Sequence, residues 1–273
     1  MIVFPPAKIN LGLNITGKRL DGFHNLQSIF FSVNLRDALE VVIDPNLAPG
    51  ELTFTCSGIP IPGNTNSNLI LRAAGMFGEV VSLPGMRVHL HKNIPMGAGM
   101  GGGSSDGTWM LRVLNELMDN PLSHNELYEI TLKLGSDCPF FLHDSACYVE
   151  GRGEVLKEIS LDLSGWTIIL INPGIHISTA EAFAMITPSE PQFELIEVMQ
   201  HPVSTWKGKL TNDFEKPACI KHPEIQSAID LLDNSGAIYT AMTGSGSTVF
   251  GLFEVDQEIP KSPDHWFVYK AQL

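Results

Sequence analysis

The sequence predicts an α/β protein of the α+β type that is built as two domains. Residues 85–91 alternate apolar and polar side chains, the pattern of a half-buried strand in an antiparallel or mixed sheet. Two amphipathic helices follow between residues 105 and 134, and a new apolar strand begins at Trp166 after a change of composition. We therefore expect a boundary near residue 155, which gives an N-terminal domain, 1–155, and a C-terminal domain, 156–273.

Size and charge limit the classes of protein to consider. The chain has 273 residues, of which 44% are hydrophobic, enough for a sizeable core. Its formal net charge of −13 repels phosphate backbones and anionic lipids, so we expect neither nucleic acid nor a membrane as its partner. No apolar run reaches the roughly 18 residues of a spanning helix. The opening MIVFPPAKIN lacks the pattern of a secretory signal, so we expect a cytoplasmic protein.

The cysteines indicate neither a disulfide framework nor a zinc site. The chain has 4 of them, far apart and without a C-x-x-C pair. We expect reduced thiols, and Cys138 in particular to be a small buried filler, because no histidine partner is evident from its spacing.

Further strands are expected on both sides of the boundary. One begins after Pro6, and residues 29–43 hold two short strands separated at 35–38. In the second domain, 166–171 and 248–253 are rich in apolar and β-branched residues and are expected to be strands.

The two helices carry end signals. Residues 105–118 repeat apolar side chains with helical spacing, and Asp106 is expected in the first turn, where the helix dipole favours an acid. In the second helix, 123–134, Ser123 and Glu126 have the spacing of a capping box, and Gly135 marks the end.

The most informative segment is PMGAGMGGGSSD, residues 95–106. Five of the seven residues from Gly97 to Gly103 are glycine, which is costly for an ordinary loop because glycine loses the most backbone entropy on ordering. Without Cβ atoms, successive N–H groups can surround a phosphate, and the start of the following helix adds its own N–H groups. Ser104 and Ser105 can cap that helix or reach a phosphate or a magnesium-bound oxygen.

Other interpretations of this segment are a flexible linker or a Rossmann loop. A linker would not be flanked by a patterned strand and a periodic helix. Gly97, Gly99 and Gly102 satisfy G-x-G-x-x-G, but the preceding strand alternates and no acid ends a second strand about 20 residues on. No Gly-Lys-Ser/Thr follows, which excludes a P-loop. A Rossmann-type oxidoreductase that binds a dinucleotide remains the alternative to a phosphate-binding loop of another enzyme class.

Three further segments place polar groups among apolar residues. Lys8 alternates with Asn10 on an extended run, so both side chains are expected on one face. Asp137, in LGSDCPFFL, is either a turn cap or a carboxylate that takes or orients the proton of an attacking hydroxyl. MTGSGSTVF, residues 242–250, is a second glycine-serine turn that is either a plain turn or closes over nucleotide phosphates.

Together these segments resemble the GHMP kinase superfamily, and within it the branch that phosphorylates a cytidine-diphosphate sugar alcohol of the non-mevalonate isoprenoid pathway. The superfamily's phosphate loop P-x-x-x-G-L-G-S-S is similar to the glycine segment here. AKINLGL with GKRLDGFH is the most specific match, and LGSDCPFF, NDFE (residues 212–215) and MTGSGST resemble the remaining blocks. The resemblance spans nearly the whole chain in the same order. It implies an N-terminal domain like ribosomal protein S5 domain 2, a ferredoxin-like C-terminal domain and an active site between them.

The resemblance implies ATP as co-substrate, Mg²⁺, and a role for each matching residue. Asp137 is expected to be the base toward the substrate hydroxyl, with Lys8 holding and polarising both that carboxylate and the hydroxyl. The resemblance implies substrate contacts from Asn10, Phe23, His24, Thr179 and Phe183: His24 at the cytosine edge, and Phe23 and Phe183 on either side of the ring. It implies ATP contacts from Pro95, Met96, Gly97, Ala98, Gly99, Met100, Gly101, Gly102, Gly103, Ser104, Ser105, Gly244 and Ser245.

The sequence departs from this pattern in a few places. Phe23 stands where tyrosine is usual, Met100 where leucine is common, and residues 107–109 replace a stretch of small residues. None removes a catalytic group. The acidic magnesium ligands stay open, as does the choice between a monomer and a homodimer. A GHMP kinase for another alcohol, and an inactive regulatory protein on the same scaffold, are the nearest alternatives.

Overall fold

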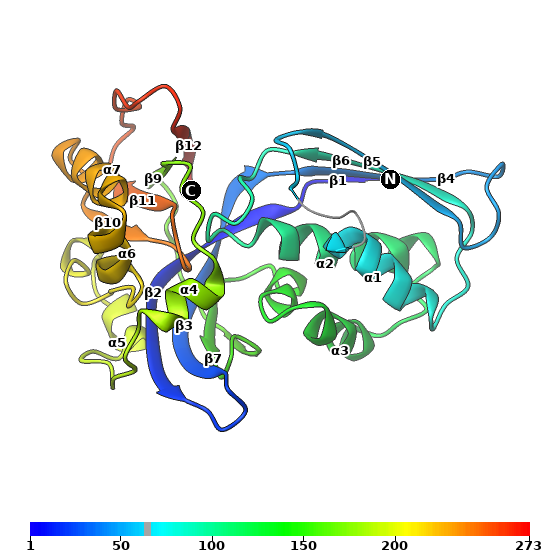
Figure 1. Ribbon diagram of the computed structural model, residues 1–273, viewed down its shortest axis with the longest axis horizontal. Helices are drawn as coiled ribbons and strands as arrows, with labels where there is room; N and C mark the ends of the chain where they lie inside the picture. Colours follow the sequence, from blue (N-terminus) through cyan, green and yellow to red (C-terminus); the bar gives the residue numbers. More distant parts are fainter. Residues whose placement is uncertain (63–66) are drawn as a thin grey trace. The chain divides into compact units, whose positions relative to one another are not determined.

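The computed structural model describes residues 1–62 and 67–273 (Figure 1). Contacts divide the chain into two compact units that are interleaved in sequence. Unit 1 holds Met1–Ala7, Leu35–Met96 and Gly101–Asp144; unit 2 holds Lys8–Asn34, Gly97–Met100 and Ser145–Leu273. A single domain boundary near residue 155 stays a prediction. In the grouping by contacts, Lys8–Asn34 and Gly97–Met100 belong to the same unit as the chain from Ser145 onward.

Unit 1 is a mixed four-stranded sheet with helices on one side (Figure 1). Its strand order is β1-β4-β6-β5, with β4 antiparallel and β5 parallel to β6. Met86, Val88 and Leu90 of β6 are buried against Leu111 and Leu114 of α2, as their alternation predicts. The elements are β1 (Ile2–Val3), β4 (Ala38–Ile43), β5 (Leu52–Gly58), β6 (Met86–Lys92), α1 (Leu69–Gly78), α2 (Gly102–Leu117), α3 (His124–Leu134) and the 3-10 helix η2 (Cys138–Leu142).

Unit 2 contains two further four-stranded sheets, β2-β3-β7-β8 and β10-β11-β9-β12. The second is covered by α7, whose Ile225, Ile229 and Leu232 pack with Ile169 and Ile171 of β9 in one core. The strands are β2 (Pro6–Lys18), β3 (His24–Arg36), β7 (Cys147–Glu150), β8 (Val155–Glu158), β9 (Thr167–Asn172), β10 (Tyr239–Met242), β11 (Val249–Phe253) and β12 (Phe267–Gln272). The helices are α4 (Thr179–Ala184), α5 (Leu195–Met199), η3 (Val203–Thr205), α6 (Glu215–Lys221) and α7 (Pro223–Asn234).

The predicted elements are confirmed, with one correction in α2. Ser123 caps α3 and both bonds of its capping box with Glu126 are present. Helix α2, however, begins at Gly102 rather than at residue 105, because Gly101 takes a left-handed φ of 67° and serves as the N-cap. Asp106 therefore lies beyond the first turn, and the expected dipole role for it is wrong.

Candidate active site

In unit 2, the first part of the glycine segment packs against the second glycine-serine turn. The Thr243 hydroxyl donates to the carbonyl of Gly99 at 3.1 Å. Gly99 has a φ of +78°, and a Cβ there would lie 2.1 Å from the Thr243 carbonyl oxygen. A Cβ on Gly244 would likewise lie 2.7 Å from the Gly99 carbonyl oxygen. Glycine is required at both positions because the two backbones touch.

Asn10 joins this pair of loops to strand β2. Its side-chain oxygen accepts the backbone N–H of Gly244 at 2.9 Å and the Thr243 hydroxyl at 3.2 Å. Its backbone N–H donates to the Thr243 hydroxyl oxygen at 3.0 Å, and its amide nitrogen donates to Ser28 at 2.8 Å. Asn10 is 1% exposed, so these hydrogen bonds are shielded from water and hold the loop firmly.

Lys8 lies beside Asn10, as the alternation along β2 predicts. Its ammonium donates to Oδ1 of Asn10 at 2.7 Å and lies 4.3 Å from the ring centroid of Phe30. Its backbone N–H donates to the carbonyl of Met100 at 2.9 Å, which ties β2 to the glycine segment. Lys8 is 3% exposed, so this cation is held inside the protein instead of in solvent.

Side chains of the NDFE block, residues 212–215, form hydrogen bonds to the backbone of the second glycine-serine turn. Asn212 donates to the carbonyls of Met242 and Gly244, at 2.8 Å each, and Glu215 accepts the Met242 N–H at 2.7 Å. Burial raises the pKa of the Glu215 carboxyl, while the N–H of Met242 opposes that rise. The NDFE block therefore positions the backbone of the loop.

In unit 1, the rest of the glycine segment forms the first turn of α2. The N–H of Ser105 donates to the carbonyl of Gly101, so the N–H groups of residues 102–104 precede the first intrahelical bond. These groups and the positive end of the helix dipole favour an anion. A Cβ on Gly102 would lie 2.8 Å from Ile94 and 3.0 Å from Lys92 Nζ, whereas Gly103 has room. The serines do not cap the helix, and Ser105 Oγ is buried without a hydrogen-bond partner in the described part of the chain.

A buried ion network lies beneath that turn. Lys92 is fully buried and donates to a carboxylate oxygen of Asp37 and, at 2.6 Å, to Oδ2 of Asp106. Asp37 also accepts the backbone N–H groups of Asn93 and Ile94. Burial raises the pKa of Asp106 to about 8, with Lys92 opposing and Asp37 adding to the rise. Asp106 Oδ1 has no hydrogen-bond partner among the residues described.

A pocket of about 270 Å³ opens beside the same turn. Apolar side chains form its walls, and Asn68, Ser67 and Asp106 add polar groups. Asn68 is itself fixed, because its side chain caps α1 by accepting the Ile70 N–H at 2.9 Å. A mostly apolar slot with a few convergent polar groups is the usual form of a small-molecule site. Its apolar lining is Phe54, Ile61, Pro62, Leu69 and Met96, together with Cys56 and Gly103.

Aromatic side chains cluster at the start of β3 in unit 2. The ring of His24 stacks on Phe183 at 4.7 Å and 16°, and Phe183 meets Phe214 edge-on at 5.0 Å. Phe23 is 55% exposed. Thr179, also exposed, is the first residue of α4 after the capping Ser178.

Asp137 is half-buried in unit 1, where α3 ends and η2 begins. Pro139 stands in the first turn of η2, so the chain direction is fixed directly after the carboxylate. The neighbouring Cys138 is fully buried, its carbonyl accepts the Thr108 hydroxyl at 2.9 Å, and burial raises the pKa of its thiol to about 11. Such a thiol is a packing residue and no nucleophile at neutral pH, as predicted.

Comparison with known proteins identifies the family. The models of the GHMP kinases N terminal domain and GHMP kinases C terminal match residues 68–145 and 195–262. A 4-diphosphocytidyl-2-C-methyl-D-erythritol kinase of Bacteroides thetaiotaomicron is 42% identical over 100% of both chains. The chain belongs to the 4-diphosphocytidyl-2-C-methyl-D-erythritol kinase family of GHMP kinases.

Other relatives agree with membership of this kinase family. Its member from Parabacteroides distasonis is 42% identical, covering 93% of this chain and 92% of that protein. A crystal structure of 4-(cytidine 5'-diphospho)-2C-methyl-D-erythritol kinase superposes with a TM-score of 0.80 at 30% identity, covering 93% of this chain and 91% of the other. Homoserine kinase from Cytophaga hutchinsonii shares the fold alone, with a TM-score of 0.70 at 14% identity over 100% and 94% of the chains. The fold is thus the two-domain GHMP kinase fold, and the kinase is ATP-dependent.

Several residues that position this kinase's loops could not be found from the sequence. Thr243 and Ser28 reach Asn10 from 233 and 18 residues away along the chain. Lys92 and Asp37 are 55 residues apart and carry no local signal, since a lone lysine at a strand end is ordinarily solvated. The residues that line the pocket form no local pattern in the sequence either. The exception is Asn68, which stands directly before an apolar helix, as an N-cap residue does.

The described part of this kinase holds neither a ready-made metal cluster nor a membrane-spanning helix. No cluster of three or more histidine, cysteine, aspartate or glutamate side chains suited to a metal occurs among residues 1–62 and 67–273. Over the same residues, every helix is too short or too polar to cross a membrane. The four cysteines are free thiols.

Proposed function

We propose that this chain transfers the γ-phosphoryl group of ATP to the 2-hydroxyl of 4-diphosphocytidyl-2-C-methyl-D-erythritol, in the non-mevalonate route to isoprenoid precursors. The observation that carries the proposal is 42% identity to a kinase of that name over the full length of both proteins. A full-length match includes the segments that would choose the acceptor, and not only the phosphate loop shared by all GHMP kinases.

The ATP phosphates would be bound by backbone N–H groups. In unit 1 these come from the first turn of α2, and in unit 2 from Gly97–Met100 and the turn at Gly244 and Ser245. The hydrogen bonds that hold these loops support this role. N–H donors that are already fixed in place need no reorganisation when negative charge develops on the transferring phosphoryl group. Phosphoryl transfer depends mainly on such positioning and neutralisation.

The pocket beside α2 is our candidate for the nucleotide base. It is mostly apolar, adjoins Gly103 of the phosphate loop, and is lined by Asp106, whose buried Oδ1 has no hydrogen-bond partner among the residues described. A flat purine with ring donors fits a slot of this chemistry. The Asn68 amide offers a second polar contact whose position is fixed by the α1 cap.

The cytidine end of the acceptor would lie at the start of β3. We assign His24 to the cytosine edge, Phe23 and Phe183 to its two faces, and Thr179 and Asn10 to further contacts with the substrate. The support is the matching motif, together with the nearness of His24 to Phe183, whose rings stack face to face at 4.7 Å and 16° and so bring a polar ring and an aromatic ring to one place.

The chemical step would use one carboxylate and one ammonium. Asp137 would take the proton from the 2-hydroxyl as its oxygen attacks the γ-phosphorus and the bond to ADP breaks. Lys8 would offset the negative charge that gathers on the transferring group. The burial of Lys8 favours this role, because a charge acts most strongly where water is excluded.

Mg²⁺ would be held chiefly by the ATP phosphates, with few ligands from the protein. The residues present fit such a site, since Ser105 Oγ is a buried oxygen without a partner in the described chain, next to the phosphate-binding turn. When bound, the ion would neutralise charge on the β- and γ-phosphates.

The test is ADP release with the purified protein, ATP, Mg²⁺ and the cytidine-diphosphate alcohol. We expect saturable turnover with that acceptor and little with mevalonate or homoserine. Efficient turnover of a cytidine-free alcohol would favour a GHMP kinase for another substrate. Nucleotide binding without turnover on any alcohol would favour an inactive scaffold.

A further inference from the structure

A cation from a separate hairpin covers Phe23, the ring that departs from the family pattern. The guanidinium of Arg152 lies 5.0 Å from the centroid of the Phe23 ring, in cation–π contact. Phe23 stands at the entry to β3, whereas Arg152 belongs to the turn between β7 and β8. The contact is therefore made by tertiary structure, between residues 129 positions apart in the sequence.

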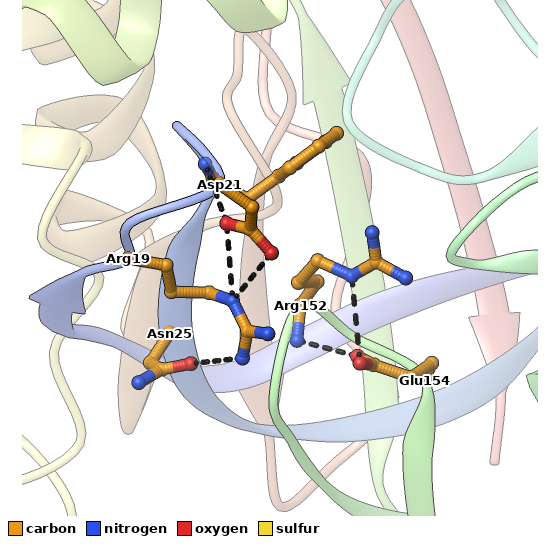
Figure 2. A network of polar contacts seen from close by, with 6 residues as sticks. Arg19, Asp21, Asn25, Arg152 and Glu154 are labelled. Carbon is orange, nitrogen blue, oxygen red and sulfur yellow. Dashed lines mark hydrogen bonds and ion pairs between the residues drawn. The ribbon is translucent and has the colours of Figure 1, made fainter.

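The turn that carries Arg152 is fixed to β3. The Leu26 N–H donates to the carbonyl of Gly151 at 2.7 Å. Gly151 has a φ of +71°, and a Cβ there would lie 2.7 Å from the Glu154 carboxylate. Glu154 accepts the backbone N–H of Arg152 and lies 3.5 Å from its Nε. The guanidinium is thus directed from a tight, internally bonded turn (Figure 2).

The loop that carries Phe23 has its own internal hydrogen bonds, to which Arg152 adds only a Coulombic attraction to Asp21 that helps to lower the pKa of that carboxyl. Arg19 donates from Nε to both oxygens of Asp21, at 3.2 and 3.1 Å, and from a terminal nitrogen to Asn25 at 2.9 Å (Figure 2). Asp21 also accepts the Phe23 N–H at 3.1 Å. The backbone of Phe23 is therefore held by this network, while its ring, 55% exposed, has the Arg152 guanidinium over it.

We propose that Arg152 is a positioning residue for the acceptor: it covers one face of Phe23 and holds that ring as a wall against which the cytosine stacks on the other face. The inference rests on the proposed function. An exposed phenyl ring without a hydroxyl has no hydrogen bond to fix its rotamer, and ordering it on binding would cost affinity. A guanidinium stacked on the ring orders it beforehand, and the attraction strengthens as the substrate displaces water.

The test measures KM for the cytidine-diphosphate alcohol, KM for ATP, and kcat, in Arg152→Ala. We expect the acceptor KM to rise about fivefold to tenfold, with kcat and the ATP KM changed less than twofold. Arg87→Ala is the matched control, because Arg87 is also an exposed arginine paired with an acid, Asp44, and belongs to unit 1. A parallel change of all three constants, or a loss of thermal stability in Arg152→Ala alone, would mean a merely structural role and overturn the proposal.

Two further variants separate action through Phe23 from direct action on the substrate's diphosphate. In a Phe23→Ala background, Arg152→Ala should raise the acceptor KM less than twofold further, because the ring it orders is gone. Arg152→Lys keeps the charge but loses the planar group, and should recover the wild-type KM only in part. A full additional effect in the Phe23→Ala background, or full recovery with lysine, would overturn the inference. If the wild-type protein releases no ADP with this acceptor, the proposed function fails; if it does and Arg152→Ala is unchanged, only the inference fails.

Discussion

The ammonium of Lys8 lies 2.7 Å from the side-chain oxygen of Asn10, two residues along strand β2. The same oxygen accepts the Gly244 N–H at 2.9 Å. One amide oxygen is therefore shared between the candidate catalytic lysine and the second glycine-serine turn. The position of the lysine and the position of the loop are consequently set together.

Asn10→Ala should lower the free energy of unfolding by about 3 kcal/mol, because several buried groups lose a partner at once. It should also lower kcat, since both Lys8 and the loop lose their shared acceptor. Urea denaturation measures the first effect and ADP release the second. Asn93→Ala is the control: that side chain donates one exposed bond to the Arg36 carbonyl, so its loss should cost under about 1 kcal/mol. Equal losses in the two variants would contradict the shared role of Asn10.

This pair also shows what could be predicted from the sequence. The alternation of Lys8 and Asn10 is a local pattern, and the structure confirms that the two side chains share a face. The partner Thr243 is 233 residues away, and no periodicity reports a contact of that range. The sequence places the start of α2 too late because glycine is a poor helix former, and only the left-handed Gly101 reveals the true N-cap. The wrong helix start also gives the wrong role for Asp106. This residue pairs with Lys92, and no local signal in the sequence indicates that Lys92 is buried.

Gly99→Ala should disrupt the contact between the glycine segment and the second turn. A Cβ at position 99 would lie 2.1 Å from the Thr243 carbonyl oxygen, and φ there is +78°, so both sterics and backbone conformation oppose the change. We expect a loss of about 2 kcal/mol or more in unfolding free energy and a weakened affinity for ATP by titration calorimetry.

Gly103→Ala is the matched comparison for stability. Gly103 lies inside α2 and its nearest neighbour to a Cβ is Leu69 at 3.8 Å. Alanine there should leave stability unchanged or raise it by about 0.5–1 kcal/mol, because alanine is the better helix former. A Gly99→Ala variant as stable as Gly103→Ala would show that the two loops do not need to touch.

Asp106→Asn should remove a dependence of stability on pH. Burial raises the folded-state pKa of Asp106 from its ordinary 3.8 to about 8, so between these values the folded protein binds a proton that the unfolded chain releases. The contribution of Asp106 is thus fully present below about pH 4 and is lost as the pH rises toward 8. The difference in unfolding free energy, wild type minus variant, should fall from pH 5 to pH 8, by at most about 1.4 kcal/mol per pH unit.

Urea denaturation of both proteins at pH 5, 6.5 and 8 measures that difference, and titrating groups that do not interact with Asp106 cancel because the two chains share them. Lys92 keeps Asp37 as a partner in the variant, so the comparison reports the titration of Asp106 together with its effect on that pair. A difference that is flat, or that grows with pH, would mean that Asp106 is ionised in the folded protein throughout this range.

Asp137→Ala should lower kcat by roughly 10²–10⁴-fold while ATP affinity persists, because a general base acts on the acceptor hydroxyl in the transition state and not on the bound nucleotide. Calorimetry with ATP and rapid-quench measurement of ADP separate the two quantities. Asp144→Asn is the control, because this carboxylate is near Asp137 in sequence but 86% exposed, and its ion pair with Arg112 is long, at 3.5 Å. The turnover of the Asp144→Asn variant should match that of the wild type. If Asp137→Ala retained turnover within tenfold of wild type, Asp137 would be a turn residue at the start of η2, and the acceptor proton would leave directly to a phosphate oxygen of the loose transition state.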